Sequence, residues 1–129
     1  MTIGYLADAF DLLNVRDLDL IAQARRRCDR LVVGVFSDEY AEQLHGRRPV
    51  VPAVERSAMV RHVRGVTEVR LHDASGAQGP ALTYHVTFVA ADSPAQEALS
   101  GAVVLTPQRE SESAILRNAL ARVQSEAVA

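Results

Sequence analysis

The sequence predicts a single α/β domain over residues 1–129, built on a five-stranded parallel sheet of the doubly wound, Rossmann-like kind. Strand-like runs alternate with helix-like runs, which implies a parallel sheet with helices on both faces. "LVVGVF", residues 31–36, is continuously apolar, as expected for a strand covered on both sides. A chain of 129 residues is long enough to bury the core of one such domain.

The first half of the chain supplies two strands and one long helix. "TIGYL", residues 2–6, predicts the first strand, and residues 31–36 predict the second. Residues 14–28 predict the helix between them, because their apolar side chains recur at helical spacing: Leu18, Ile21, Ala24 and Cys28. Asn14 is a favoured residue for the position that caps a helix start.

The second half continues the alternation of strands and helices. The apolar patterns predict strands over 66–71, 86–91 and 102–106, and helices over 53–64 and 113–125. Shorter helices are predicted at 38–44 and 94–99. In a doubly wound sheet, ligands bind beyond the carboxyl ends of the strands. The site is therefore expected in the loops at that edge, residues 7–17, 37–48, 91–94 and 106–113.

The composition argues against several classes of protein. The formal net charge is −2, from 14 basic and 16 acidic side chains, whereas a general nucleic-acid binder would be clearly basic. No apolar stretch approaches the roughly 20 residues that span a membrane, and the N-terminus lacks the basic start of a signal peptide. We therefore expect a cytoplasmic protein that binds neither nucleic acid nor membrane.

No metal site is predicted. The four histidines are far apart and lack the spacing of metal ligands, and His45 alone falls in an expected site loop. Each is interpreted as an incidental polar residue. The single cysteine, Cys28, is interpreted as a small core residue.

Several segments together resemble one enzyme family. "AFDLLNVRDLDLIAQARRRCDRLVVGVFSDEY" is similar to the opening of a glycerol-3-phosphate cytidylyltransferase, a member of the HxGH nucleotidyltransferases. "GRRPVVPAVERSAMVRHVRGVTEV" and "RESESAILRNAL" are similar to later segments of that family. The resemblance implies attack of an alcohol phosphate on the α-phosphate of CTP, which forms a CDP-alcohol and releases pyrophosphate. It also implies Mg²⁺ with the nucleoside triphosphate and a homodimer.

The chain departs from the family in the signature itself. Asn14 stands at the first histidine position, Arg16 at the glycine and Asp17 at the second histidine. Asn14 can donate only a neutral hydrogen bond, and an ionised Asp17 would repel a triphosphate. The same residues form a good helix start, with an acid at the positive end of the helix dipole. The corner thus looks like inherited geometry whose original chemistry has been lost.

The resemblance assigns further nucleotide or phosphate contacts, each with a structural alternative. Ala9 and Phe10 open the corner, and Ala9 replaces a threonine of the family. Arg47 and Arg48 match a phosphate-binding basic loop, or form a solvated one. Arg56 contacts nucleotide, or pairs with a carboxylate. The remaining candidates, at the distal end of the chain, are Asp92, Arg109, Ser111 and Ser113, of which the serines serve equally well as helix caps.

Three functions follow from these residues. The first is a cytidylyltransferase-like pseudoenzyme that keeps the fold and weak binding of CTP or phosphate. The second is an active nucleotidyltransferase in which Arg16, with Arg47 or Arg48, replaces the histidines. The third is a dimeric interaction module without ligand.

Overall fold

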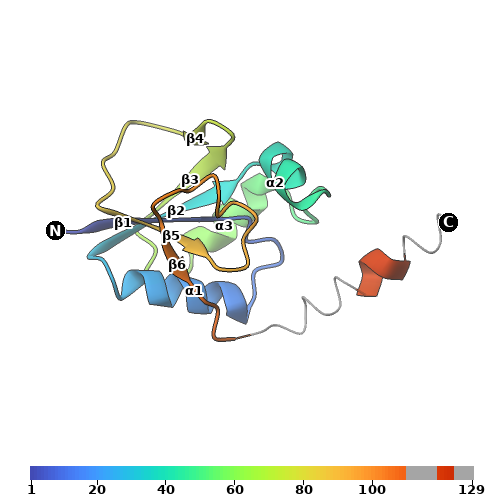
Figure 1. Cartoon of the computed structure of the whole chain (residues 1–129), viewed down its shortest axis with the longest axis horizontal. Coiled ribbons are helices and arrows are strands. Elements are labelled where there is room, and N and C mark those ends of the chain that lie inside the picture. The colour runs from blue at the N-terminus through green and yellow to red at the C-terminus, as the bar shows by residue number, and fades with distance from the viewer. Residues whose placement is uncertain (110–118, 124–129) are drawn as a thin grey trace.

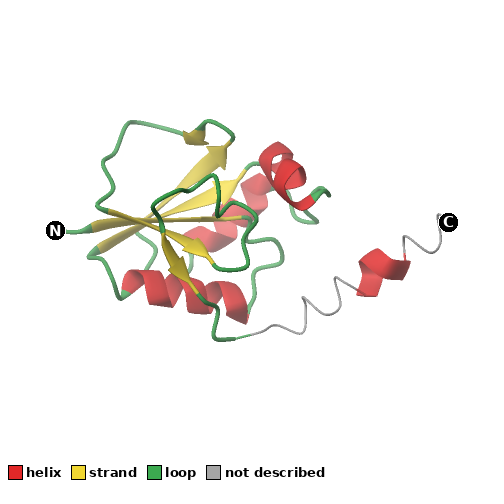
Figure 2. Ribbon diagram, viewed as in Figure 1, coloured by secondary structure: helices red, strands yellow, loops and turns green. Residues whose placement is uncertain are grey.

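The computed structural model describes residues 1–109 and 119–123, and it forms an α/β domain around one sheet (Figure 1). The strands are β1 (Ile3–Asp8), β2 (Arg30–Phe36), β3 (Glu68–Asp73), β4 (Gly76–Ala77), β5 (Val86–Ala90) and β6 (Val103–Leu105). The helices are α1 (Val15–Arg25), α2 (Asp38–His45) and α3 (Ala53–Arg61). Figure 2 shows α1 running alongside the strands on one side of the sheet.

The sheet is mixed and has six strands in the order β4-β3-β2-β1-β5-β6. Five strands pair in parallel, and the two-residue strand β4 pairs antiparallel with β3. The prediction of five strands is therefore wrong, because the sheet has a sixth strand, β4, at its edge. The turn at Ala74 and Ser75 folds the chain back on itself into β4. A strand of two residues has no apolar pattern to reveal it in the sequence.

The five parallel strands follow the order of a doubly wound sheet. β1 continues through α1 to β2 on one side, whereas β5 and β6 lie on its other side. The direction of winding therefore reverses between β1 and β5, which is where such sheets bind ligands.

The core has two layers because alternate strand residues point to opposite faces. On one face, Leu6 and Val33 pack with Leu20 and Ile21 of α1 and with Val60 of α3. The other face carries a smaller cluster that includes Ala41 of α2: Tyr5, Ala7, Ala9, Phe36, Ala41 and Ala95. Cys28 is buried in the first layer, as the sequence indicates.

Most predicted elements are present, with shifted ends. The helix expected over 53–64 ends at Arg61, and the short helix expected near 38–44 is α2. The helix expected over 94–99 is wrong, because that segment forms turns. Of the last predicted helix, residues 119–123 are described and helical. None of the helices in the described part of the chain has the length and apolar character needed to cross a membrane.

Candidate active site

The corner between β1 and α1 has an unusual backbone. Phe10 and Leu12 adopt φ angles of 53° and 54°, in the left-handed region that bulky residues avoid. Neighbouring groups hold this conformation: Asp8 Oδ1 accepts from the amide of Ala9 at 2.7 Å, and Asn14 Nδ2 donates to the Leu12 carbonyl at 2.9 Å. The chain is thereby turned sharply from the sheet into the helix.

The start of α1 is capped by its own side chains. Asn14 Oδ1 accepts a hydrogen bond from the amide of Arg16 at 2.9 Å, and Asp17 Oδ2 accepts from the amide of Asn14 at 3.3 Å. These two side chains form a capping box, which confirms the cap predicted at Asn14 and adds the hydrogen bond from the Asn14 amide to Asp17. They occupy two of the amide donors that an anion at this helix end would use.

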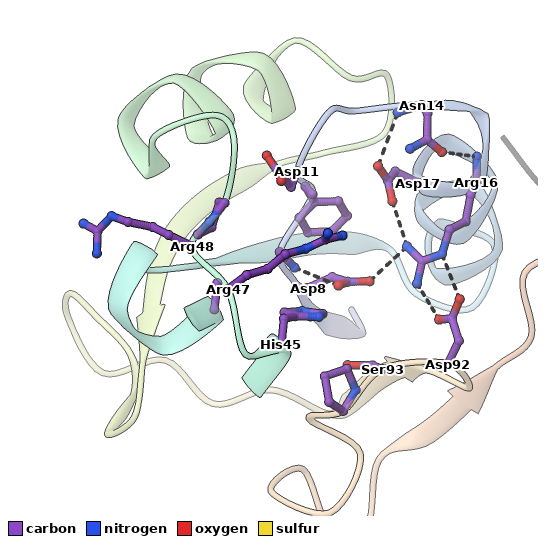
Figure 3. A pocket seen from close by; sticks show the side chains of 15 residues that line it. Asp8, Asp11, Asn14, Arg16, Asp17, His45, Arg47, Arg48, Asp92 and Ser93 are labelled. Carbon is purple, nitrogen blue, oxygen red and sulfur yellow. Dashed lines mark hydrogen bonds and ion pairs between the residues drawn. The ribbon is translucent and has the colours of Figure 1, made fainter. Parts of the chain in front are cut away.

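A cavity of about 250 Å³ lies beside this corner, at the carboxyl ends of β1 and β5. Figure 3 shows side chains from the corner, from the end of α2 with the loop behind it, and from the loop after β5 around this cavity. The lining residues are Asp8, Ala9, Phe10, Asp11, Asn14, Arg16, Asp17, Ala41, His45, Arg47, Arg48, Pro49, Asp92, Ser93 and Pro94. Three of the four predicted loops therefore meet at the cavity.

Arg16 is the centre of the charged network in the cavity. Its Nη1 lies 2.8 Å from Asp17 Oδ1 and 3.3 Å from Asp8 Oδ2. Its Nε donates to Asp92 Oδ2 at 3.0 Å, and its Nη2 lies 2.5 Å from Asp92 Oδ1. One guanidinium thus holds three carboxylates, and it joins the first turn of α1 to the loop after β5.

Burial and neighbouring charges change the acidity of this network. Burial, together with the nearby charge of Asp8, raises the pKa of Asp17 to about 6, although Arg16 opposes the shift. Burial alone would lower the pKa of Arg16. The hydrogen bond to Asp92 and the charges of Asp8, Asp92 and Asp17 outweigh this effect, so the pKa is raised above its ordinary value. Arg16 therefore stays charged at every physiological pH.

The basic loop divides into two unlike arginines. Arg48 lies near three acids of α2, which are Asp38, Glu39 and Glu42. The shortest of these distances, 3.3 Å, joins Arg48 Nη1 to Glu42 Oε2. Arg47 is exposed, and Figure 3 shows its side chain directed into the cavity, whereas Arg48 points away from it. No ion pair of Arg47 with another described residue is present, so its charge is available to a ligand.

Arg56 lies behind the cavity wall and does not line it. Its side chain is 1% exposed and donates to the carbonyls of Val51 and Ala9 at 2.7 and 2.6 Å, and to Asp38 at 2.7 Å. The structure therefore gives Arg56 the carboxylate pairing that the sequence left as an alternative to nucleotide contact.

The structure brings together eight of the residues that the sequence singles out: Ala9, Phe10, Asn14, Arg16, Asp17, Arg47, Arg48 and Asp92. Arg109 is exposed and outside the lining, and Ser111 and Ser113 lie outside the described residues.

Sequence reasoning did not select Asp8, Asp11, His45 or Ser93 as site residues, although the expected loops contain all four. Asp8 is an acid that directly follows the apolar run of the first strand, and this signal in the sequence could have identified it. No group of three or more potential metal-ligating side chains occurs within 1–109 and 119–123.

Comparison with solved structures shows that another protein has the same fold. The structure of the lipopolysaccharide core biosynthesis protein from Thermoplasma volcanium GSS1 superposes with a TM-score of 0.67, covering 86% of this chain and 99% of that one. The sequences are 19% identical, so this similarity concerns the fold.

The family follows from the sequence comparison. Residues 9–119 match the family described as cytidylyltransferase-like, and the chain belongs to that family. It is 42% identical over 65 residues to the bifunctional protein HldE of Acidiphilium cryptum (strain JF-5), and 35% identical over 74 residues to HldE of Caulobacter sp. (strain K31). These matches cover 50% and 57% of this chain but only 13% and 15% of the two relatives.

Proposed function

We propose that this chain is a nucleotide- or phosphate-binding member of the cytidylyltransferase-like family whose nucleotidyl-transfer activity is weakened or lost. The single observation that carries the proposal is the Arg16 network. Arg16 and Asp17 stand at positions where the resemblance expects a glycine and a histidine, and they are bound to each other at 2.8 Å. The ligands proposed from the resemblance are CTP, carried with Mg²⁺, and an alcohol phosphate.

The weakened chemistry follows from what the first turn of α1 can offer. Transfer from CTP requires the site to position the triphosphate and to stabilise charge that develops around the α-phosphorus. Asn14 already uses its amide group within the corner, donating to Leu12 and accepting from Arg16. Asp17 adds a negative charge whenever it is ionised. Losing one electrostatic donor typically reduces a rate by about 10²–10³, so losing two should reduce it further.

An active enzyme with a rearranged site is the second candidate. The observation in its favour is Arg47, which is directed into the cavity and has no ion pair with another described residue. Together with Arg16 it could supply the positive charge that histidines supply in relatives. A homodimer, with or without ligand, is a further proposal that light scattering of the purified chain tests.

Calorimetric titration with CTP and with ATP, each with Mg²⁺, tests the proposed function. We expect saturable binding of CTP at micromolar to millimolar concentration and little or no release of pyrophosphate with glycerol 3-phosphate. Rapid turnover would establish the active alternative. Absence of any heat up to millimolar nucleotide would contradict both and leave the interaction module.

A restored signature provides the matched comparison. The triple variant Asn14→His, Arg16→Gly, Asp17→His introduces the family residues at the corner. We expect it to raise pyrophosphate release above the wild-type level, provided that its circular dichroism matches the wild type. If the variant folds and binds CTP but is no faster than the wild type, the signature residues do not explain the weak activity.

A further inference from the structure

The guanidinium of Arg16 has two edges in different surroundings. Its inner nitrogen, Nη1, is held by Asp8 and Asp17, whose side chains are only 6% and 4% exposed. Asp8 also accepts the amide of Ala9, and Asp17 also accepts the amide of Asn14. Because both carboxylates are buried and have further hydrogen bonds, they fix the position of the guanidinium.

The outer edge of Arg16, formed by Nε and Nη2, is bound by Asp92 alone among the described carboxylates. The two contacts, at 3.0 and 2.5 Å, form a bidentate fork. The side chain of Asp92 is 55% exposed and comes from the loop after β5, so it can turn toward water. An arginine fork of this geometry binds either carboxylate or phosphate oxygens in a bidentate manner.

We propose that Asp92 is an internal competitor, which occupies the anion-binding edge of Arg16 until the phosphate group of a ligand displaces it. This inference rests on one part of the proposed function, which is that the phosphate groups of the ligand bind in this cavity. The anion then binds to Nε and Nη2 of Arg16, while Asp8 and Asp17 keep the guanidinium in place.

Burial decides which carboxylate leaves. Asp92 is half exposed, so water and salt screen its ion pair with Arg16, and a released Asp92 regains its hydration. Releasing Asp8 or Asp17 would instead leave a buried carboxylate without its partner, which is far more costly. Arg47 faces the cavity from the loop after α2 and adds a second positive charge for the incoming anion (Figure 3).

Titration with inorganic pyrophosphate tests the exchange without involving a nucleobase. The Asp92→Asn variant removes the competing charge, and Glu97→Gln makes the same change at an exposed position of the same loop. We expect Asp92→Asn to bind pyrophosphate about tenfold more tightly than the wild type, because it removes both the competing ion pair and the repulsion between Asp92 and the bound anion. Glu97→Gln should bind it within about twofold of the wild type. Thermal unfolding of each variant checks that the fold is retained.

A second pair of variants tests whether Arg16 is the receiving group. Arg16→Lys keeps one positive charge beside Asp8 and Asp17 but lacks the planar fork. Combined with Asp92→Asn, it should remove most of the gain in pyrophosphate affinity. Retention of the full gain in this folded double variant would show that the anion binds elsewhere and would overturn the inference.

The outcomes separate this inference from the proposed function. Equal pyrophosphate affinity of Asp92→Asn and Glu97→Gln overturns the competitor role, whereas CTP binding by the wild type would still support the proposed function. Conversely, pyrophosphate binding that depends on Asp92, together with no preference for CTP over pyrophosphate, supports the competitor role. That result contradicts the nucleotide part of the proposed function and leaves a phosphate-binding protein.

Discussion

Arg56 donates a hydrogen bond of 2.6 Å from Nη1 to the carbonyl oxygen of Ala9, and so ties α3 to the corner between β1 and α1. The same guanidinium holds Val51 through its carbonyl and Asp38 at the start of α2. One buried side chain therefore fixes three segments around the cavity, including the corner in which Phe10 has a positive φ angle.

Replacing Arg56 with Met should destabilise the fold by about 3 kcal/mol, because the carbonyls of Ala9 and Val51 lose their donor and Asp38 loses its closest positive charge. Urea unfolding measures the change. Arg61→Met, at an exposed position of the same helix, is the control and should lie within about 0.5 kcal/mol of the wild type. Similar stabilities of the two variants would contradict the structural role of Arg56.

Asn14→Ala should lower the free energy of unfolding by about 1 kcal/mol, because the amide of Arg16 loses its acceptor at the start of α1. Asn14→Ser should restore most of the loss, since a serine hydroxyl also caps helices. Chemical denaturation of both variants measures the effect. If the serine variant is as unstable as the alanine variant, the helix cap is not what Asn14 contributes.

Asp17 should make stability depend on pH in the acidic range. Its pKa in the folded protein, about 6, lies above the ordinary value of 3.8, so folding favours the protonated carboxyl. Its stabilising contribution is complete below about pH 4 and is lost as the pH rises through about 6. Relative to Asp17→Asn, the wild type should therefore lose up to about 3 kcal/mol between pH 4 and pH 7. Thermal unfolding at several pH values compares the two proteins, and parallel curves would contradict the raised pKa.

Gly34 lies beneath the ring of Tyr5, and a Cβ atom at this position would stand 1.9 Å from the Tyr5 hydroxyl oxygen. Gly34→Ala should therefore destabilise the domain by about 1–3 kcal/mol through overpacking. In a Tyr5→Ala background the same change should have a much smaller effect, because the clash is gone. A double-mutant cycle by urea unfolding measures this coupling, and additive effects would be incompatible with the contact.

Much of the fold could be predicted because its signals are local. The apolar run of β2 and the spacing of Ile21 and Ala24 in α1 reflect which face each element buries. The prediction that Leu18 lies on the same buried face is wrong, because Leu18 is 43% exposed and Leu20 is buried in the core instead. β4 could not be predicted in this way, since only its pairing with β3 makes those two residues a strand. The segment after β5 has helix-compatible residues but folds as turns, with Ala95 in the core of the second face.

In the site, too, some features follow from local signals in the sequence and others depend on tertiary contacts. The sequence by itself determined the family, the helix start at Asn14 and the edge of the sheet where loops carry polar side chains. Only the tertiary structure decided that Arg16 binds Asp92, 76 positions away, and that Arg56 is buried behind the cavity. The physical reason is that capping and periodicity act between neighbours in the chain, whereas ion pairing and burial depend on which strand ends the sheet order places side by side.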